Sequence, residues 1–161
     1  MESPSRRYLA PTGKTLAWIT RIHRGLYRLT GGAIGSVLPQ RAEDGDRWPL
    51  RTMRVLLLTT TGRKSGQART VPLPYYSYDG RTFLVASFSG GDKHPAWYLN
   101  LRDNPEVEVQ IGRQQQRARA VTVEGEDRAR MWPRLIAEWQ RYAVYQRKTD
   151  REIPLVELIL R

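Results

Sequence analysis

The residues with the clearest chemistry form a short basic segment, Gly62-Arg63-Lys64-Ser65-Gly66, with Arg69 three residues further on. The two glycines permit a tight turn, which leaves backbone N–H groups and three cations able to bind an anion. Hydrogen bonds from charged donors suit such a turn to phosphate or carboxylate. On spacing alone, a solvated hairpin tip explains the same residues equally well. A Walker A loop is excluded, because Arg63 replaces the glycine that would precede the lysine.

A second group of residues follows at positions 86–105, with the sequence ASFSGGDKHPAWYLNLRDNP. Taken together, the GRKSG…R…P segment, the ASFSGG turn and HPAWYLNLRDNP resemble the deazaflavin-dependent nitroreductase family. The resemblance extends from about Leu50 to the C-terminus and is loose over the first fifty residues. It implies a split β-barrel fold and the use of coenzyme F420.

The resemblance also implies an activity and a set of binding residues. The enzyme would transfer hydride from reduced F420 to an electron-poor acceptor such as a quinone or a nitroaromatic. Arg63, Lys64 and Arg69 match the family's basic positions that hold the phosphodiester and glutamate tail of the cofactor. The positions that would line the deazaflavin ring and its side chain are Val71, Pro72, Ala86, Ser87, Gly91, Trp97 and Asn100.

Three hydroxyl groups are candidates for a catalytic role: Ser87, Tyr142 and Tyr145. Hydride addition leaves negative charge on the acceptor, so a nearby hydroxyl that donates a hydrogen bond or a proton would lower the barrier. The two tyrosines match family tyrosines that wall the substrate pocket, although their spacing fits a packed aromatic pair equally well. Phe88, Ser89 and Pro74 depart from the family pattern on the substrate side.

Composition limits the chemistry that the chain can perform. The 161 residues suit one domain, and no apolar run is long enough to span a bilayer or to form a signal peptide, so we expect a soluble cytoplasmic protein. The absence of cysteine excludes disulfides and thiolate sites, and two distant histidines predict no metal site. The net charge of +11 favours an anionic partner. Nucleic acid is not expected, because no recognition helix or stacking sheet is evident.

The N-terminal segment, residues 1–35, reads as an arm followed by a basic amphipathic helix, and residues 36–161 as the barrel domain. Trp18, Ile22 and Leu26 recur at helical spacing among lysines and arginines. Such a helix can pack on the barrel, or it can rest on an anionic membrane surface as in a peripheral membrane protein.

The remaining sequence alternates between strand and helix patterns. Strands are predicted at residues 54–60, 71–78, 81–88, 106–111, 115–123 and 153–160, with a hairpin turn at Asp79-Gly80. Pro72 and Pro74 predict that their strand lies at an edge or a bulge. A short helix begins near Pro95, and a longer helical region at residues 126–148 should kink or split at Pro133 near Trp132. Five or six strands with short helices predict an α+β barrel.

Two other functions fit the sequence. A related split-barrel protein could bind flavin mononucleotide, or a tetrapyrrole-like ligand, through Arg63 and Lys64. The chain could also be a membrane-surface binding protein without catalysis, in which case residues 1–30 would be essential and Arg69 would not. A monomer and a homodimer are equally compatible with the sequence.

Overall fold

The computed structural model describes Gly25 and residues 53–161. The expected N-terminal arm and basic helix, and the boundary near residue 35, therefore lie outside the described residues except for Gly25. Within the described part, no helix is both long enough and apolar enough to cross a membrane.

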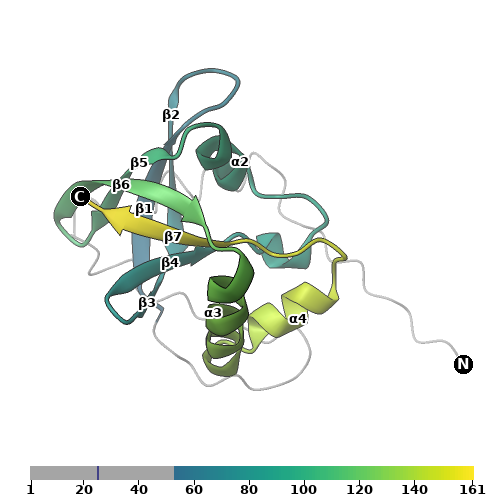
Figure 1. The fold of residues 1–161 in the computed structure, drawn as a ribbon. Coiled ribbons are helices and arrows are strands. Elements are labelled where there is room, and N and C mark those ends of the chain that lie inside the picture. The colour runs from purple at the N-terminus through teal and green to yellow at the C-terminus, as the bar shows by residue number, and fades with distance from the viewer. Residues whose placement is uncertain (1–24, 26–52) are drawn as a thin grey trace, which may run out of the picture.

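One antiparallel sheet forms the centre of the described structure (Figure 1). Its strand order is β2-β1-β5-β6-β7-β4-β3. Apolar and β-branched residues dominate the buried strands because they fit a pleated surface that is covered on both faces. The bounds are β1 (Val55–Thr61), β2 (Ala68–Pro74), β3 (Tyr76–Tyr78), β4 (Arg81–Val85), β5 (Glu106–Ile111), β6 (Gln114–Thr122) and β7 (Leu155–Leu160).

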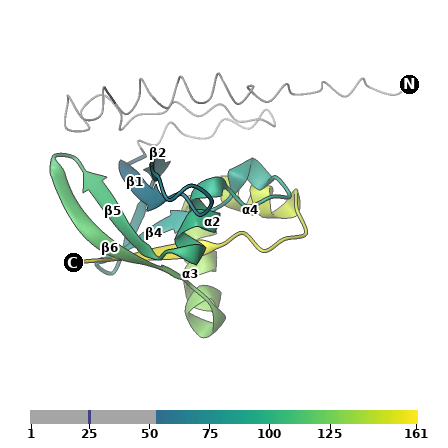
Figure 2. The ribbon, with the colours of Figure 1, turned by 90° about the horizontal axis from the view of Figure 1, so that it is seen from above.

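The two edge strands of this sheet, β2 and β3, follow each other in the chain with only Tyr75 between them. β2 pairs with β1, whereas β3 pairs with β4 at the opposite edge. The chain therefore joins the two edges and curls the sheet into a split barrel, of which the curved β5–β6 hairpin forms one side (Figure 2). The prediction of a split β-barrel is confirmed.

The predicted strand at 71–78 is in fact two strands, which explains why the described sheet has seven strands instead of five or six. The bend follows Pro74, and the Tyr75 N–H bonds to the Arg54 carbonyl at 3.0 Å. The prediction that Pro72 and Pro74 lie on an edge strand is confirmed. The next strand ends at Val85, earlier than predicted, and a single 3₁₀ turn, η1 (Phe88–Gly90), follows.

The barrel interior holds the main apolar cluster. Leu56 and Leu58 of β1 point into it, together with Leu84 of β4, and all three are fully buried. The helix α2 (Ala96–Asp103) adds Trp97 and Leu101 to the same cluster. Because α2 supplies core residues, it is fixed to the barrel and can position groups next to it.

Two further helices, α3 (Gly125–Glu138) and α4 (Arg141–Arg147), cover the outer face of β3, β4 and β7 (Figure 1). Of the predicted kink or split at Pro133, the split is wrong, since α3 runs through Pro133 to Glu138, and the kink stays a prediction. A proline removes one helical hydrogen bond, and burial of Met131 and Leu135 on either side of it offsets that loss. The helix breaks instead at Trp139, whose ring centroid lies 5.1 Å from that of Tyr76.

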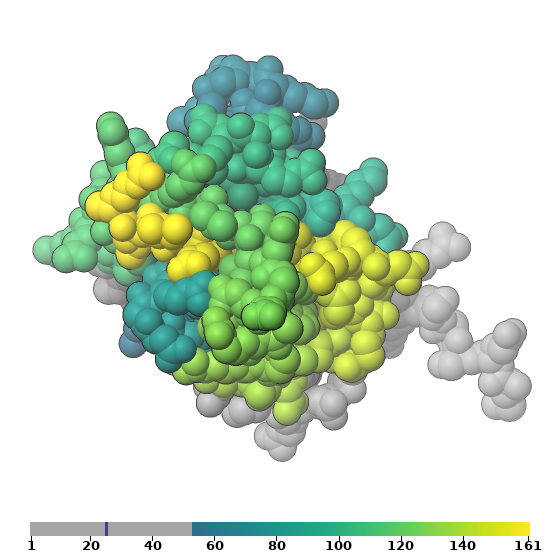
Figure 3. Space-filling model, in the orientation of Figure 1, coloured from purple at the N-terminus to yellow at the C-terminus, as the bar shows by residue number. Residues whose placement is uncertain are grey.

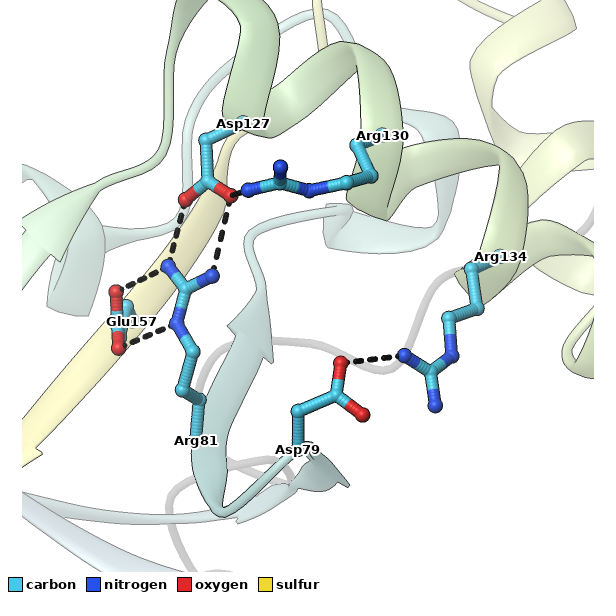
Figure 4. Close-up of polar contacts among 6 residues, drawn as sticks. All are labelled: Asp79, Arg81, Asp127, Arg130, Arg134 and Glu157. Atoms are coloured by element: carbon cyan, nitrogen blue, oxygen red, sulfur yellow. Dashed lines mark hydrogen bonds and ion pairs between the residues drawn. The ribbon is translucent and has the colours of Figure 1, made fainter.

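Ion pairs fasten α3 to the sheet (Figure 4). Arg81 of β4 lies 2.6 Å from both Asp127 of α3 and Glu157 of β7. Hydrogen bonds from Arg81, and then from Arg130, lower the pKa of Asp127 to about 2. Near the predicted Asp79-Gly80 turn, where both residues have positive φ, Asp79 pairs with Arg134 of α3.

Candidate functional site

The basic segment forms a tight turn between β1 and β2. The Gly62 carbonyl accepts hydrogen bonds from the N–H groups of Ser65 at 3.1 Å and Gly66 at 2.7 Å. A Cβ atom at position 62 would lie 2.8 Å from the Ser65 Oγ and 3.1 Å from the Gln67 carbonyl oxygen, so the turn needs a glycine there. Gly66 has φ of 66°, which favours glycine. The two glycines therefore form the turn that was predicted from them.

Asn100 of α2 holds this turn against the barrel. Its Oδ1 accepts a hydrogen bond from the Arg63 backbone N–H at 3.1 Å, and its Nδ2 donates to the Thr60 hydroxyl at 3.1 Å. The side chain is buried, with 6% of the residue exposed. Asn100 thus links the turn, the end of β1 and α2, a role that the sequence did not reveal because its partners lie about forty positions away.

A pocket of about 330 Å³ lies between the turn and α2. Figure 3 shows the turn standing out from the body of the molecule beside α2. The pocket collects six of the predicted cofactor residues, namely Arg63, Lys64, Arg69, Val71, Trp97 and Asn100. The rest of its lining is Thr60, Gly62, Ser65 and Ala96.

The charged residues that line the pocket are all cations. Arg63, Lys64 and Arg69 are exposed, and no carboxylate in residues 53–161 forms an ion pair with any of them. Within residues 53–161, the Arg69 guanidinium donates to the neutral amide of Gln67, at 3.1 Å. The same pocket is also lined by the apolar residues Val71, Ala96 and Trp97. This combination can hold an anionic group together with a flat apolar group.

Four of the predicted cofactor residues are not in the pocket lining: Pro72, Ala86, Ser87 and Gly91. Ala86 lies in the barrel interior and is fully buried. Ser87 and Gly91 flank η1, in which Phe88, Ser89 and Gly90 have φ values of 48°, 55° and 80°. These residues form a second segment of the candidate site, and their contact with a cofactor stays a prediction.

The tyrosines lie near η1 and not in the cationic pocket. Tyr142 is 4% exposed and its hydroxyl lies 2.5 Å from that of Tyr76. Burial raises the pKa of Tyr142 well above its ordinary value, so the hydroxyl stays protonated. The half-buried Tyr145 meets Tyr142 edge to face at 6.0 Å. Its backbone carbonyl packs on Gly90, where a Cβ would lie 2.8 Å away. Their catalytic role stays a prediction.

Sequence reasoning missed Arg151, which lies between α4 and β7. Its guanidinium donates to the Ser87 carbonyl at 2.7 Å and to the Gly91 carbonyl at 2.8 Å. No motif surrounds Arg151 in the sequence, and its partners lie about sixty positions away, so no local pattern pointed to it.

A second hollow, of about 350 Å³, lies on the outer face of β1, β5 and β6. Its charged lining residues are Glu108 and Arg117, and it has no cluster of cations. The described residues contain no group of three or more histidines and carboxylates arranged to bind a metal. Of these two hollows, the pocket beside α2 therefore fits an anionic organic ligand better.

Comparisons with known proteins give a consistent result. The family described as F420H(2)-dependent quinone reductase matches residues 18–159. The chain is 37% identical over 148 residues to an F420H(2)-dependent quinone reductase of Mycobacterium tuberculosis, covering 89% of this chain and 91% of that protein.

Solved structures also match. A structure of an F420-H2 dependent reductase is 42% identical with a TM-score of 0.58, and the match covers 65% of this chain and 93% of that one. Another, described as a domain-swapped dimer, is 35% identical with a TM-score of 0.61, covering 89% of this chain and 98% of that one.

Proposed function

Because the chain belongs to the F420H(2)-dependent quinone reductase family, we propose that it reduces a quinone with hydride from reduced coenzyme F420. The observation that carries the proposal is the pocket that Arg63, Lys64 and Arg69 line together with apolar residues, without carboxylate partners among the described residues. A cofactor with an anionic chain and a flat ring requires both features.

The protein contributes binding and orientation. Arg63, Lys64 and Arg69 bind the phosphodiester and carboxylates, and each charge-assisted hydrogen bond is worth about 1.5–3 kcal/mol. Trp97 and Val71 provide an apolar wall beside the ring, and Asn100 keeps the turn in place. The bound reduced deazaflavin supplies the hydride, while the protein sets position and electrostatics.

A hydroxyl near the acceptor would stabilise the negative charge that develops on it. Ser87 is the first candidate, because the Tyr142 hydroxyl already bonds to Tyr76, which also accepts from Arg141 at 2.7 Å. Tyr145 is the second, since it is half-buried and packs against η1.

The acceptor and the partners extend this proposal. Quinones are the proposed physiological acceptors, and nitroaromatics are proposed as artificial ones. Quinones dissolve in lipid, so peripheral contact between the basic N-terminal segment and an anionic membrane would bring enzyme and acceptor together. A homodimer is proposed because one similar structure is described as a domain-swapped dimer. Sedimentation with anionic vesicles tests the membrane contact, and light scattering tests the dimer.

The first test of the function is a fluorescence titration with oxidised F420, and in parallel with flavin mononucleotide, at low and moderate salt. We expect micromolar binding of F420 that weakens with salt, followed by oxidation of reduced F420 when a naphthoquinone is added. The control variant is Arg134→Ala; the Arg134 guanidinium on α3 pairs with Asp79 in the turn between β3 and β4. Tight flavin binding without a response to F420 would contradict the proposal and favour the flavin-binding alternative.

A further inference from the structure

Arg151 connects three separate parts of one loop. Its Nε donates to the Gly91 carbonyl at 2.8 Å, and its Nη2 donates to the carbonyls of Ser87 at 2.7 Å and Ala86 at 3.3 Å. Its Nη1 lies 3.3 Å from Nδ1 of His94. All four partners lie in residues 86–94, between β4 and α2, whereas Arg151 enters from the connection between α4 and β7.

The loop that Arg151 holds has a strained backbone. Phe88 and Ser89 have positive φ, a conformation that L residues with side chains adopt rarely and at a cost. Such a backbone persists only where the surrounding structure holds it. Within the turn, the Ser87 carbonyl accepts from the Gly90 N–H at 3.0 Å, and the Phe88 carbonyl accepts from the Gly91 N–H at 3.0 Å.

Two sets of contacts hold the turn. Gly90 packs so closely on α4 that a Cβ would lie 2.8 Å from the Tyr145 carbonyl and 3.0 Å from the Lys148 Cβ. The second set comes from the guanidinium of Arg151, whose planar fork reaches several carbonyl oxygens at once. Lysine cannot reproduce this geometry, because its ammonium is a single point of charge on a flexible stem.

The imidazole of His94 suits its place in this arrangement. Burial, and next the charges of Arg151 and Arg102, lower the pKa of His94. A neutral ring can accept a hydrogen bond at Nδ1, which is what the nearby Nη1 of Arg151 requires. The ring is also packed on Tyr98 of α2, with centroids 5.0 Å apart. Through His94, Arg151 is therefore linked to the helix that carries Trp97 and Asn100.

We propose that Arg151 is a positioning residue of the cofactor site, which fixes the strained turn so that Ser87 and Gly91 face the deazaflavin. Arg151 does not itself touch the cofactor in this proposal. The inference rests on the proposed function for the identity of the cofactor, but the order of the turn can be measured without any cofactor.

The test compares wild-type protein, Arg151→Lys and Arg151→Ala. The matched control is Arg134→Lys, which changes an arginine that pairs with Asp79 away from the site. Each protein is assayed for the KM of reduced F420, for kcat with a naphthoquinone, for the temperature of unfolding, and for amide hydrogen exchange in residues 86–94. The Arg151→Ala assays are repeated with added guanidinium ion.

We expect Arg151→Lys to raise the KM for reduced F420 about tenfold, because a turn that is no longer fixed must be ordered when the cofactor binds. Exchange in residues 86–94 should become faster, while exchange in β1 and β5 stays at the wild-type rate. Guanidinium should restore the KM of Arg151→Ala, whereas the control should match wild type. If Arg151→Ala does not fold, rescue is measured on Arg151→Gln.

Three outcomes would overturn the inference. The first is a wild-type KM with wild-type exchange in Arg151→Lys. The second is faster exchange with an unchanged KM, which would make Arg151 a structural residue only. The third is a lower unfolding temperature without any effect of guanidinium on KM. If wild-type protein fails to bind F420, the proposed function fails separately, and the exchange rates alone decide whether Arg151 fixes the turn.

Discussion

Two groups of cations in this molecule have opposite surroundings. On the α3 side of the barrel, Arg81, Arg130 and Arg134 each lie within 2.7 Å of a carboxylate oxygen. At the turn between β1 and β2, Arg63, Lys64 and Arg69 have no carboxylate partner among the described residues. Paired charges cancel locally and connect elements, whereas unpaired charges leave a positive potential that an anion can use. The surroundings of a cation therefore indicate its role better than its residue type does.

The proposed role of the unpaired cations is to bind the cofactor. Replacing Arg63 and Arg69 together by alanine should weaken F420 binding about a hundredfold, since each lost charge-assisted hydrogen bond costs about tenfold. A fluorescence titration measures the loss, and the salt dependence of binding should also decrease. Arg130→Ala is the matched control and should bind as wild type does. Equal losses in both variants would show that only the overall charge matters.

A second variant loosens the turn between β1 and β2 without changing its charge. Asn100→Ala removes the acceptor of the Arg63 N–H and the amide donor to the Thr60 hydroxyl, which should lower the free energy of unfolding by about 1–3 kcal/mol. F420 affinity should fall about fivefold to tenfold because the cations lose their fixed position. Urea unfolding and the same titration measure the two effects. Unchanged affinity in a less stable protein would mean that the turn binds equally well when mobile.

On the paired side, a substitution should affect stability and not binding. Arg81→Met removes the contacts to Asp127 and Glu157 while keeping apolar bulk over Phe83. The Arg81 side chain is 31% exposed, so solvent screening limits the loss to about 1 kcal/mol. Urea unfolding measures it. A change in F420 affinity of more than twofold would show that the paired arginines also affect cofactor binding.

The smallest expected effect is on the stability of the protein at low pH. The pKa of Asp127 is lowered to about 2 in the folded protein, so its contribution to stability is complete above its ordinary pKa of 3.8 and is lost as the pH falls towards 2. Unfolding temperatures measured between pH 5 and pH 2 should therefore fall less steeply in Asp127→Asn than in wild type. Equal slopes in the two proteins would show that the ion pairs of Asp127 with Arg81 and Arg130 do not stabilise the folded state.

Local patterns in the sequence were sufficient for much of the fold and for part of the site. The Asp79-Gly80 hairpin, the buried strand β1 and the edge strand with Pro72 and Pro74 all depend on residues close together in sequence. The glycine-bracketed turn is local as well, and its cations do line a pocket.

The features that the sequence did not reveal depend on distant partners. The bend at Tyr75 separates two halves of one extended segment, because the first half pairs with β1 and the second half pairs with β4. The continuity of α3 through Pro133 depends on the surface that Met131 and Leu135 cover. The four contacts of Arg151 span about sixty positions, and no periodicity encodes them.

The place of β7 within the sheet has a consequence for how the protein is made. β7 follows the other six described strands in the chain, yet it lies between β6 and β4 and pairs with both. Those six strands therefore leave two unpaired edges on the ribosome until β7 emerges, and the described sheet cannot form simply in chain order. The barrel should close in one late step that joins residues more than seventy positions apart, such as Thr82 and Leu158.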